Sequence, residues 1–471
     1  MGNPLRRRRR DGKLCPVGCV IKIDRVRTVG LGIVAAGIAL VSCTSATSSP
    51  PVTSTSGTSQ LAAGVRYETL VDSSRPTPAN GSVPGHPGRV LKTTIFYPAQ
   101  GRAGPAPIND APPDRKSAPY PLIVFAHGFG SSVSAYQALL ERWAEAGYVV
   151  AAPLFPLTSD STIGSPDLAD FANQPADLSF VITQVLQESA HSGGLLSGLV
   201  NPHRIGAAGH SLGGVTILGL VANTCCHDAR VTAAVVMSGD PISFPTGVVH
   251  FSAAPPLLLV HGNADQVVPY VSSIDAFNSA MAPKGLLTIE GGDHGSPVRQ
   301  NGKAFASVVR TTVGFFDRYL KAQSGGVTDL ASDVSRSRTT LTFVYRAGQN
   351  VHLAAPRSIS RHRQATVSPS GDLADGQSLQ VTWKGFAPGV SVNVLECSKS
   401  PPTAAGDCDL QTAKLLQADP NGFGTLPFQI HSGTVGSGMC SASHPGCVVV
   451  VNEGGSMASS SSVIIPVSFA R

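Results

Sequence analysis

The sequence contains little charge and few aromatic side chains. Of its 471 residues, 14% are charged and 6% are aromatic, whereas 42% are hydrophobic. A chain of this composition can bury a core, so we exclude an intrinsically disordered protein. The length exceeds that of one ordinary domain and predicts two or three folded units with tails.

Long basic runs are absent beyond the first 27 residues. Those residues contain nine Lys and Arg, including the run Arg6 to Arg10, against Asp11 and Asp24, which is a net charge of +7. Subtracting this from the formal charge of +6 for the whole chain leaves −1 for the remainder. A phosphate-binding surface needs clustered cations, so we expect no nucleic-acid partner.

The apolar run near the N-terminus is too short to cross a membrane. Val29 to Val41 consists only of Val, Gly, Leu, Ile and Ala, but a helix needs roughly 20 residues to span a bilayer core of about 30 Å. A basic stretch, a short apolar run and then small residues are typical of a secretory signal. We therefore expect residues 1–43 to be a signal peptide and the protein to be exported.

The end of this signal, Leu40-Val41-Ser42-Cys43, resembles the lipobox of bacterial lipoproteins. The resemblance implies that Cys43 is lipidated, becomes the new N-terminus and anchors the protein to the outer face of the bacterial cell membrane. The alternative is an ordinary signal peptide that is cleaved near Ala46. Residues 44–63 are rich in Ser, Thr and Pro, which predicts a flexible tether.

No cysteine spacing in the sequence is typical of a metal site, and we expect no metal or other cofactor. With the cysteines of the leader and Cys43 set aside, an even number remains, which favours disulfides in an exported chain. For the adjacent residues Cys225 and Cys226, a disulfide between the two and disulfides to other chains both stay open. The six residues are Cys225, Cys226, Cys397, Cys408, Cys440 and Cys447.

Strand-like and helix-like segments alternate over residues 64–322, which predicts an α/β fold with a doubly wound, mainly parallel sheet. We expect strands at 65–71, 90–97, 121–126, 148–152, 204–208, 231–237, 257–260 and 286–289. We expect helices at 135–146, 176–188, 212–222, 271–281 and 305–320. Residues 323–364 are interpreted as a linker with one strand at 340–345, and residues 365–471 as a second domain built of short strands.

A candidate nucleophile lies between a predicted buried strand and a predicted helix. The sequence Gly209-His210-Ser211-Leu212-Gly213 matches GxSxG, and its context is that of a nucleophile elbow. The glycines permit a sharp turn that exposes the Ser211 hydroxyl at a helix N-terminus. A serine also needs a histidine base and a carboxylate that orients the base.

The expected partners of Ser211 follow later strands in the order serine, acid, histidine. Asp265 follows the strand at 257–260, and His294 follows the last strand of the domain. Asp240, at the end of the preceding strand, is the rival acid, whereas Asp293 is expected to shape the histidine loop. We expect structural or surface roles for five other histidines: His127, His203, His210, His227 and His261.

His127-Gly128-Phe129-Gly130 directly follows the strand at 121–126 and is similar to the His-Gly oxyanion motif of lipases and esterases. This resemblance implies that the main-chain N–H groups of Phe129 and Leu212 form an oxyanion hole. Residues 64–322 resemble the branch of the α/β-hydrolase family that includes polyester hydrolases, platelet-activating factor acetylhydrolases and chlorophyllases. Only the loop 153–173 is available as a cover, which predicts an open site for small or extended esters.

The C-terminal segment, residues 365–471, resembles the neocarzinostatin family of small immunoglobulin-like chromoproteins. The resemblance rests on residues 365–370, 373–376, 385–389 and 392–397 and on four cysteines in two close pairs. It implies a β-sandwich with the disulfides Cys397–Cys408 and Cys440–Cys447. Spacing or surface contact is the favoured role of this domain over small-molecule binding.

The sequence thus predicts a secreted, lipid-anchored serine hydrolase that cleaves carboxylic esters through an acyl-serine intermediate. Two alternatives stay open. One is a surface binding protein that uses the C-terminal domain to hold a hydrophobic ligand, and the other is an amidase or peptidase with the same catalytic residues.

Overall fold

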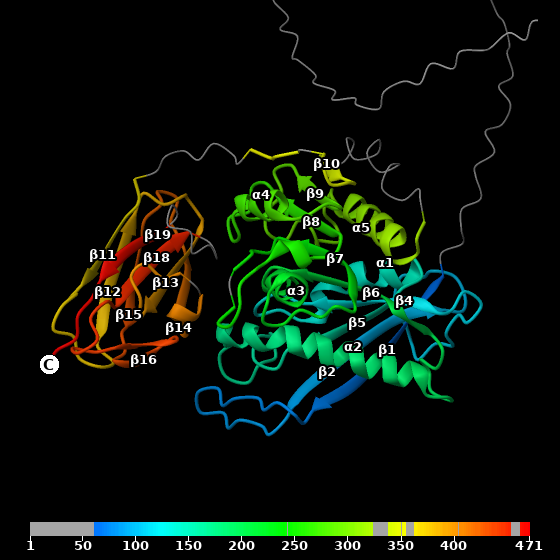
Figure 1. Cartoon of the computed structure of the whole chain (residues 1–471), viewed down its shortest axis with the longest axis horizontal. Coiled ribbons are helices and arrows are strands. Elements are labelled where there is room, and N and C mark those ends of the chain that lie inside the picture. Colours follow the sequence, from blue (N-terminus) through cyan, green and yellow to red (C-terminus); the bar gives the residue numbers. More distant parts are fainter. Residues whose placement is uncertain are drawn as a thin grey trace, which may run out of the picture. The chain divides into compact units, whose positions relative to one another are not determined.

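The fold is described from a computed structural model, shown in Figure 1. The described residues are 61–242, 244–323, 338–349, 351–354, 362–403, 405–453 and 462–471. The expected signal peptide, Cys43 and nearly all of the expected tether lie outside these residues. The part that is described contains no helix long and apolar enough to cross a membrane.

A single ten-stranded sheet organises the first domain, with the strand order β10-β9-β8-β7-β6-β4-β5-β2-β1-β3. The strands from β9 to β5 in this order run parallel to one another, whereas β2 and β10 are antiparallel to their neighbours β5 and β9. The strands are β1 (Ala62–Asp72), β2 (Arg89–Ala99), β3 (Ile108–Asn109), β4 (Tyr120–Ala126), β5 (Val149–Leu154), β6 (Val200–His210), β7 (Val231–Met237), β8 (Leu257–Gly262), β9 (Lys284–Ile289) and β10 (Thr339–Val344).

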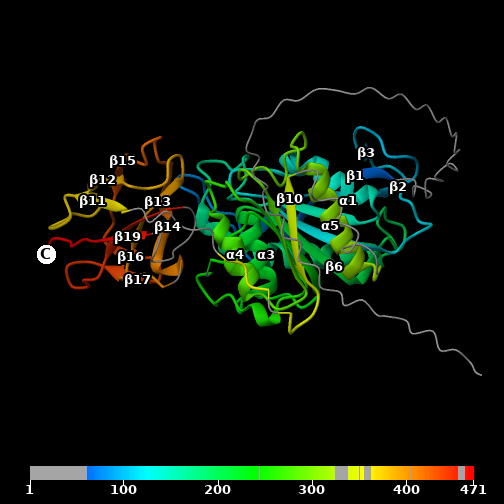
Figure 2. The ribbon, with the colours of Figure 1, turned by 90° about the horizontal axis from the view of Figure 1, so that it is seen from above.

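Helices cover both faces of this sheet, which confirms the α/β-hydrolase-type fold class. One face carries α1 (Gln137–Glu145) and α5 (Phe305–Leu320), which lie side by side in Figure 2. The other face carries α2 (Gln174–Ala190), α3 (Leu212–Ala222) and α4 (Tyr270–Ser279). Parallel strands are therefore buried on both faces, which explains why β4 is apolar throughout rather than alternating.

Strand β10 differs from the expectation for its region. It lies inside the segment interpreted as a linker, yet it pairs antiparallel with β9 and forms the edge of the large sheet. Only its end residues, Thr339 and Val344, are buried, so the strand has no apolar run or regular alternation that would reveal a partner in the sequence.

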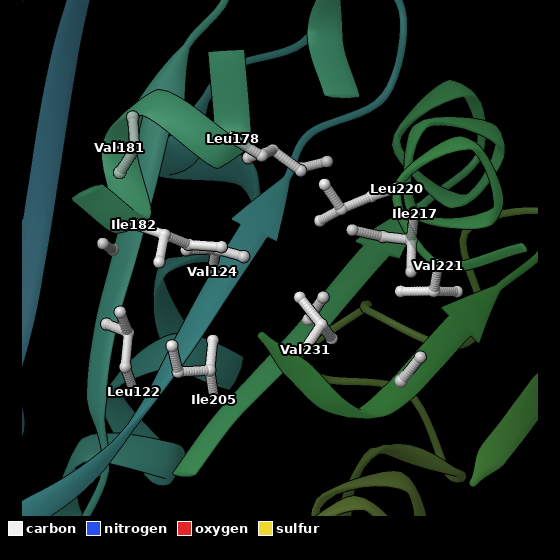
Figure 3. Packing of buried hydrophobic residues seen from close by; sticks show 14 of the residues in the cluster. Leu122, Val124, Leu178, Val181, Ile182, Ile205, Ile217, Leu220, Val221 and Val231 are labelled. Carbon is white, nitrogen blue, oxygen red and sulfur yellow. The ribbon is translucent and has the colours of Figure 1, made fainter. Parts of the chain in front are cut away.

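Aliphatic side chains of α2 and α3 pack onto the strands that lead to the candidate nucleophile. Figure 3 shows Ile182 of α2 and Ile217 and Val221 of α3 above β4, β6 and β7. Each of these side chains is essentially excluded from solvent. Because α3 is buried along its whole length, its N-terminus, which begins at Leu212, is held in a fixed position over the sheet.

A buried ion network joins β2 to the first turn of α2 and to the segment that precedes it. The guanidinium of Arg89 is fully buried and binds Asp170 through two parallel hydrogen bonds of 2.9 Å. It also donates to both oxygens of Asp177, at 2.7 and 2.6 Å. Asp170 belongs to the short 3₁₀ helix η2 (Leu168–Asn173), so this network anchors the end of the loop 153–173.

The second domain consists of two antiparallel sheets and a short ribbon. One sheet contains β11 (Gln364–Ser368), β12 (Ser378–Lys384) and β15 (Gly424–Gln429); the other contains β14 (Cys408–Gln417), β13 (Ser391–Cys397), β18 (Val448–Glu453) and β19 (Ser462–Pro466). The ribbon is formed by β16 (Gly433–Val435) and β17 (Gly438–Cys440). Both sheets contribute to a core around Trp383 and Phe428, as expected for an immunoglobulin-like sandwich.

The expected disulfides of this domain are confirmed. Cys397 pairs with Cys408, which lies opposite it in the β13–β14 register, and Cys440 pairs with Cys447. Cys225 and Cys226 are bonded to each other, so the first of the two alternatives holds for this pair.

We expect Arg89→Ala to lower the free energy of unfolding by roughly 3–5 kcal/mol, because it leaves the buried Asp170 without a counter-charge and Asp177 with only that of the partly exposed Arg75. Arg66→Ala is the matched control, since Arg66 pairs with Glu68 but is partly exposed, and should cost less than about 1 kcal/mol. Urea unfolding followed by circular dichroism measures both. Equal losses in the two variants would show that the Arg89 network is not a stabilising anchor.

Candidate active site

Ser211 occupies a strained turn between β6 and α3. Its φ is +57° and its ψ is −123°, a conformation that non-glycine residues rarely adopt. A side chain at Gly209 would collide with the Gly213 backbone, and one at Gly213 would collide with the Ala126 carbonyl. The glycines therefore allow α3 to begin directly against β4 and β6, as a nucleophile elbow requires.

The side chains of Ser211, His294 and Asp265 form one continuous hydrogen-bond chain. Ser211 Oγ lies 2.8 Å from His294 Nε2, and His294 Nδ1 lies 2.8 Å from Asp265 Oδ2. A carboxylate can only accept, so Nδ1 donates to Asp265 and Nε2 is left to accept the serine proton. This is the geometry that a serine nucleophile, its base and an orienting acid require.

The three side chains follow the carboxyl ends of parallel strands of one sheet. Ser211 follows β6, Asp265 follows β8 and His294 follows β9. These ends meet at the same edge of the sheet, the usual location of sites in open α/β folds. The structure therefore brings together all three residues that the sequence singled out.

The carboxylate of Asp265 is fully buried and surrounded by donors. Oδ1 accepts the main-chain N–H groups of Val267 and Val268 at 2.8 and 2.9 Å, while Oδ2 faces His261 and His294. Burial alone would raise the pKa of Asp265, but the hydrogen bonds from the two histidines hold it well below its usual range. Asp265 is thus an anion at every ordinary pH.

The rival acid, Asp240, is not connected to His294. It is buried beyond the end of β7, where it bonds Ser272, and its Oδ2 has no hydrogen-bond partner among the described residues. Burial raises the pKa of Asp240 to about 6. Asp293 is exposed and bonds Ser296 and Arg299, as expected for a residue that shapes its own loop.

The main-chain N–H groups of Phe129 and Leu212 are free to bind a ligand. Within the described part of the chain, neither donates a hydrogen bond to another residue. The two groups flank Ser211, because Leu212 follows it and Gly128 packs so closely that an added Cβ would lie 3.2 Å from Ser211 Cβ. Phe129 is 40% exposed.

Two of the histidines to which the sequence assigns structural roles make main-chain contacts. His127 Nε2 accepts the N–H of Phe155 and Nδ1 donates to the Gly128 carbonyl, which orders the loop that contains Phe129. His210 Nε2 donates to the His294 carbonyl at 2.8 Å, and Nδ1 accepts from Tyr136. Burial, reinforced by the nearby His294, lowers the pKa of His210 to about 3, so this ring stays neutral.

Tyr136 is a contributor that the sequence did not indicate. Its hydroxyl accepts the N–H of Gly128 at 3.0 Å and faces His210 Nδ1 at 3.2 Å. The oxyanion loop and the histidine loop are therefore connected through Tyr136 and His210. No pattern reveals this link, because Tyr136 belongs to the 3₁₀ helix η1 (Val133–Tyr136), 74 residues from its partner.

Apolar side chains adjoin the nucleophile on one side. Phe171 of η2 and Phe244 contact Leu212 and Val215 in a small buried cluster, with the two rings 4.9 Å apart. Phe171 belongs to the loop 153–173, which is too short to form a large lid. No group of His, Cys, Asp and Glu with the arrangement of a metal site is present among the described residues.

Comparison with known proteins agrees with this architecture. Residues 91–264 match the family model described as Chlorophyllase, and residues 365–469 match the model described as Neocarzinostatin family. With the ten-stranded sheet and the elbow at Ser211, these matches define a protein that joins an α/β-hydrolase domain to an all-β domain. The C-terminal segment is 32% identical over 101 residues to macromomycin of Streptomyces macromomyceticus, covering 20% of this chain and 69% of that protein. The chain belongs to the neocarzinostatin family through this domain.

Two further similarities concern the hydrolase domain. The chain is 30% identical over 115 residues to the uncharacterised protein YfhR of Escherichia coli, covering 20% of this chain and only 39% of that protein. A ferulic acid esterase from Streptomyces cinnamoneus superposes with a TM-score of 0.46 at 22% identity, covering 61% of this chain and 98% of that one.

We expect Asp265→Asn to lower kcat by about 10⁴, because an amide cannot stabilise the histidine tautomer that accepts the serine proton. Asp240→Asn is the matched control at the rival position and should keep kcat within about threefold. Steady-state hydrolysis of p-nitrophenyl butyrate measures both. The opposite result would make Asp240 the acid.

The same Asp240→Asn variant tests the raised pKa of Asp240. Between about pH 4 and pH 6 the folded protein keeps a proton on Asp240 that the unfolded chain releases, so stability falls as pH rises through this range. Asn cannot titrate, and its curve of unfolding free energy against pH should lack that fall. Parallel curves for the two proteins would contradict the assignment.

Proposed function

We propose that the protein is a serine carboxylic-ester hydrolase that acts through an acyl-serine intermediate. The observation that carries this proposal is the hydrogen-bond chain from Ser211 through His294 to Asp265, placed on a strained elbow beside two free N–H groups. The match of residues 91–264 to the Chlorophyllase family model supports a hydrolase of esterase type.

In the first half of the reaction, Ser211 Oγ attacks the ester carbonyl while His294 Nε2 takes its proton. The carbonyl oxygen becomes negative, and the N–H groups of Phe129 and Leu212 stabilise that charge. Asp265 stabilises the imidazolium of His294 without taking a proton from it. His294 then gives the proton to the leaving alcohol, and the acyl group stays on Ser211.

In the second half, water attacks the acyl group while His294 takes one of its protons. The tetrahedral intermediate collapses, His294 returns the proton to Ser211 Oγ, and the carboxylic acid leaves. The short loop over the site and the exposed Phe129 ring favour small or extended ester substrates over ones enclosed by a large lid.

We expect Ser211→Ala to lower kcat on short p-nitrophenyl esters by about 10⁴–10⁶ and to abolish labelling by a fluorophosphonate probe. Ser192→Ala, in the exposed turn after α2, is the matched control and should behave as the wild type. An inactive wild type that holds an apolar ligand would favour the binding-protein alternative. A matched anilide cleaved as fast as the ester would favour an amidase or peptidase.

We also propose that the protein is exported and lipid-anchored through Cys43. The support is the basic stretch, the short apolar run and Leu40-Val41-Ser42-Cys43 in the sequence. A tether of Ser, Thr and Pro would then hold the enzyme away from the outer face of the membrane.

We expect the wild type to partition into the detergent phase of Triton X-114 and Cys43→Ala to move into the aqueous phase or keep its signal peptide. Mass spectrometry of the N-terminal peptide identifies the modification directly. Ser42→Ala is the matched control and should remain lipidated. An aqueous wild type that begins after Ala46 would show ordinary signal cleavage instead.

The C-terminal domain offers a second binding surface. An open cleft of about 580 Å³ is lined by Leu373, Asp375, Ser441 and Phe469 among others. We infer an accessory role in spacing or surface contact, with this cleft as the place where a small molecule would bind.

A further inference from the structure

His261 contacts the acid of the proposed triad on the side opposite the base. It lies at the end of β8, is fully buried, and its Nε2 is 3.1 Å from Asp265 Oδ2 and 3.1 Å from the Val268 carbonyl oxygen. Its Nδ1 is 2.7 Å from Ser273 Oγ on α4. The sequence predicts for His261 only a hydrogen bond to the local backbone.

The surroundings of His261 permit a single arrangement of its hydrogens in the neutral ring. The two groups that face Nε2 are an ionised carboxylate and a carbonyl, and both can only accept. Nε2 must therefore carry the hydrogen, which leaves Nδ1 to accept from the Ser273 hydroxyl. The result is a directed chain from Ser273 through His261 to Asp265, which meets the chain from Ser211 through His294 at the same oxygen.

We propose that His261 is a positioning residue for the reaction: its Nε2–H holds Asp265 Oδ2 in line with His294 Nδ1. This inference rests on the proposed function, because it assigns a role within the same site. His261 touches neither substrate nor the reacting atoms and acts only through Asp265.

The Asp265 carboxylate needs the His261 donor because main-chain groups hold only one of its two oxygens. Oδ1 is fixed by the N–H groups of Val267 and Val268, whereas Oδ2 has only the two imidazoles. When His294 becomes an imidazolium during attack, its bond to Oδ2 must stay short and straight to stabilise the charge. A second fixed donor on Oδ2 keeps that oxygen from rotating out of line and leaves no lone pair unsatisfied in a buried site.

The His261 ring is itself held from α4. Besides the Ser273 hydroxyl, the Tyr270 ring packs edge-on against it at 5.7 Å with an interplanar angle of 90°. The Tyr270 hydroxyl is 2.6 Å from Thr288 Oγ1 on β9. Helix α4 thus holds the His261 ring directly through Ser273 and Tyr270, and β9 in turn holds Tyr270. A residue that positions a catalytic group needs such support.

The test compares two replacements of His261 that differ only in whether a donor remains. In His261→Leu the donor is lost, and we expect kcat/KM on p-nitrophenyl butyrate to fall by about 10- to 100-fold, the usual effect of losing a hydrogen bond to a charged group. In His261→Gln the side-chain amide can donate from the place of Nε2, and we expect kcat/KM within about fivefold of the wild type. Ser279→Ala, at the exposed end of α4, is the control and should leave kcat/KM unchanged.

The acid limb of the pH profile gives a readout that a purely structural role would not move. Without the His261 donor, more of the negative charge of Asp265 acts on His294 and stabilises its imidazolium. The acid limb should therefore shift to higher pH in His261→Leu and not in His261→Gln. Two other titratable groups interact with this cluster, His210 on β6 with Asp265 and Asp240 beyond β7 with His261, and both are unchanged in the two variants.

Nitrogen-15 NMR of histidine-labelled protein tests the same proposal without turnover. The resonances that disappear in His261→Gln should show a protonated Nε2 and an unprotonated Nδ1. The opposite tautomer would overturn the proposal, and so would equal losses of kcat/KM in the Leu and Gln variants or a Leu variant as active as the wild type. A wild type without esterase activity would refute the proposed function instead, while the tautomer still reports whether His261 donates to Asp265.

Discussion

The close crossing of α3 over β4 and β6 is the constraint from which the site follows. At Gly209 and Gly213 the backbones approach so closely that no side chain fits, and the intervening Ser211 is driven to a φ of +57°. Such strain persists only where the surrounding structure compensates for it. Here α3 is buried along its whole length, and its packing over the parallel strands supplies that compensation.

Around this elbow the structure arranges supports for each polar group. His210 binds the main chain of His294, Tyr136 connects His210 to the oxyanion loop, and Asp265 accepts donors at both of its oxygens. A catalytic arrangement of hydrogen bonds works only when its members are held to within fractions of an ångström. The Tyr136 hydroxyl, the neutral His210 ring and the main-chain donors to Asp265 fix these positions without competing for the proton that His294 carries.

The two domains are stabilised by different interactions. The hydrolase domain depends on a two-faced apolar core and on the buried pairing of Arg89 with Asp170 and Asp177. The C-terminal domain is smaller, and two short-loop disulfides supplement its core.

The sequence by itself determined the domain order, most strands and helices, and the residues Ser211 and His294, with Asp265 as the favoured acid, because hydrophobic periodicity and short motifs are local. The helices at 212–222 and 305–320 were predicted to the residue. Only the tertiary structure decided that β10 joins the sheet, that Asp265 rather than Asp240 faces His294, and that Tyr136 and His261 support the site. Those outcomes depend on contacts between segments far apart or on the direction of single side chains, which no local pattern records.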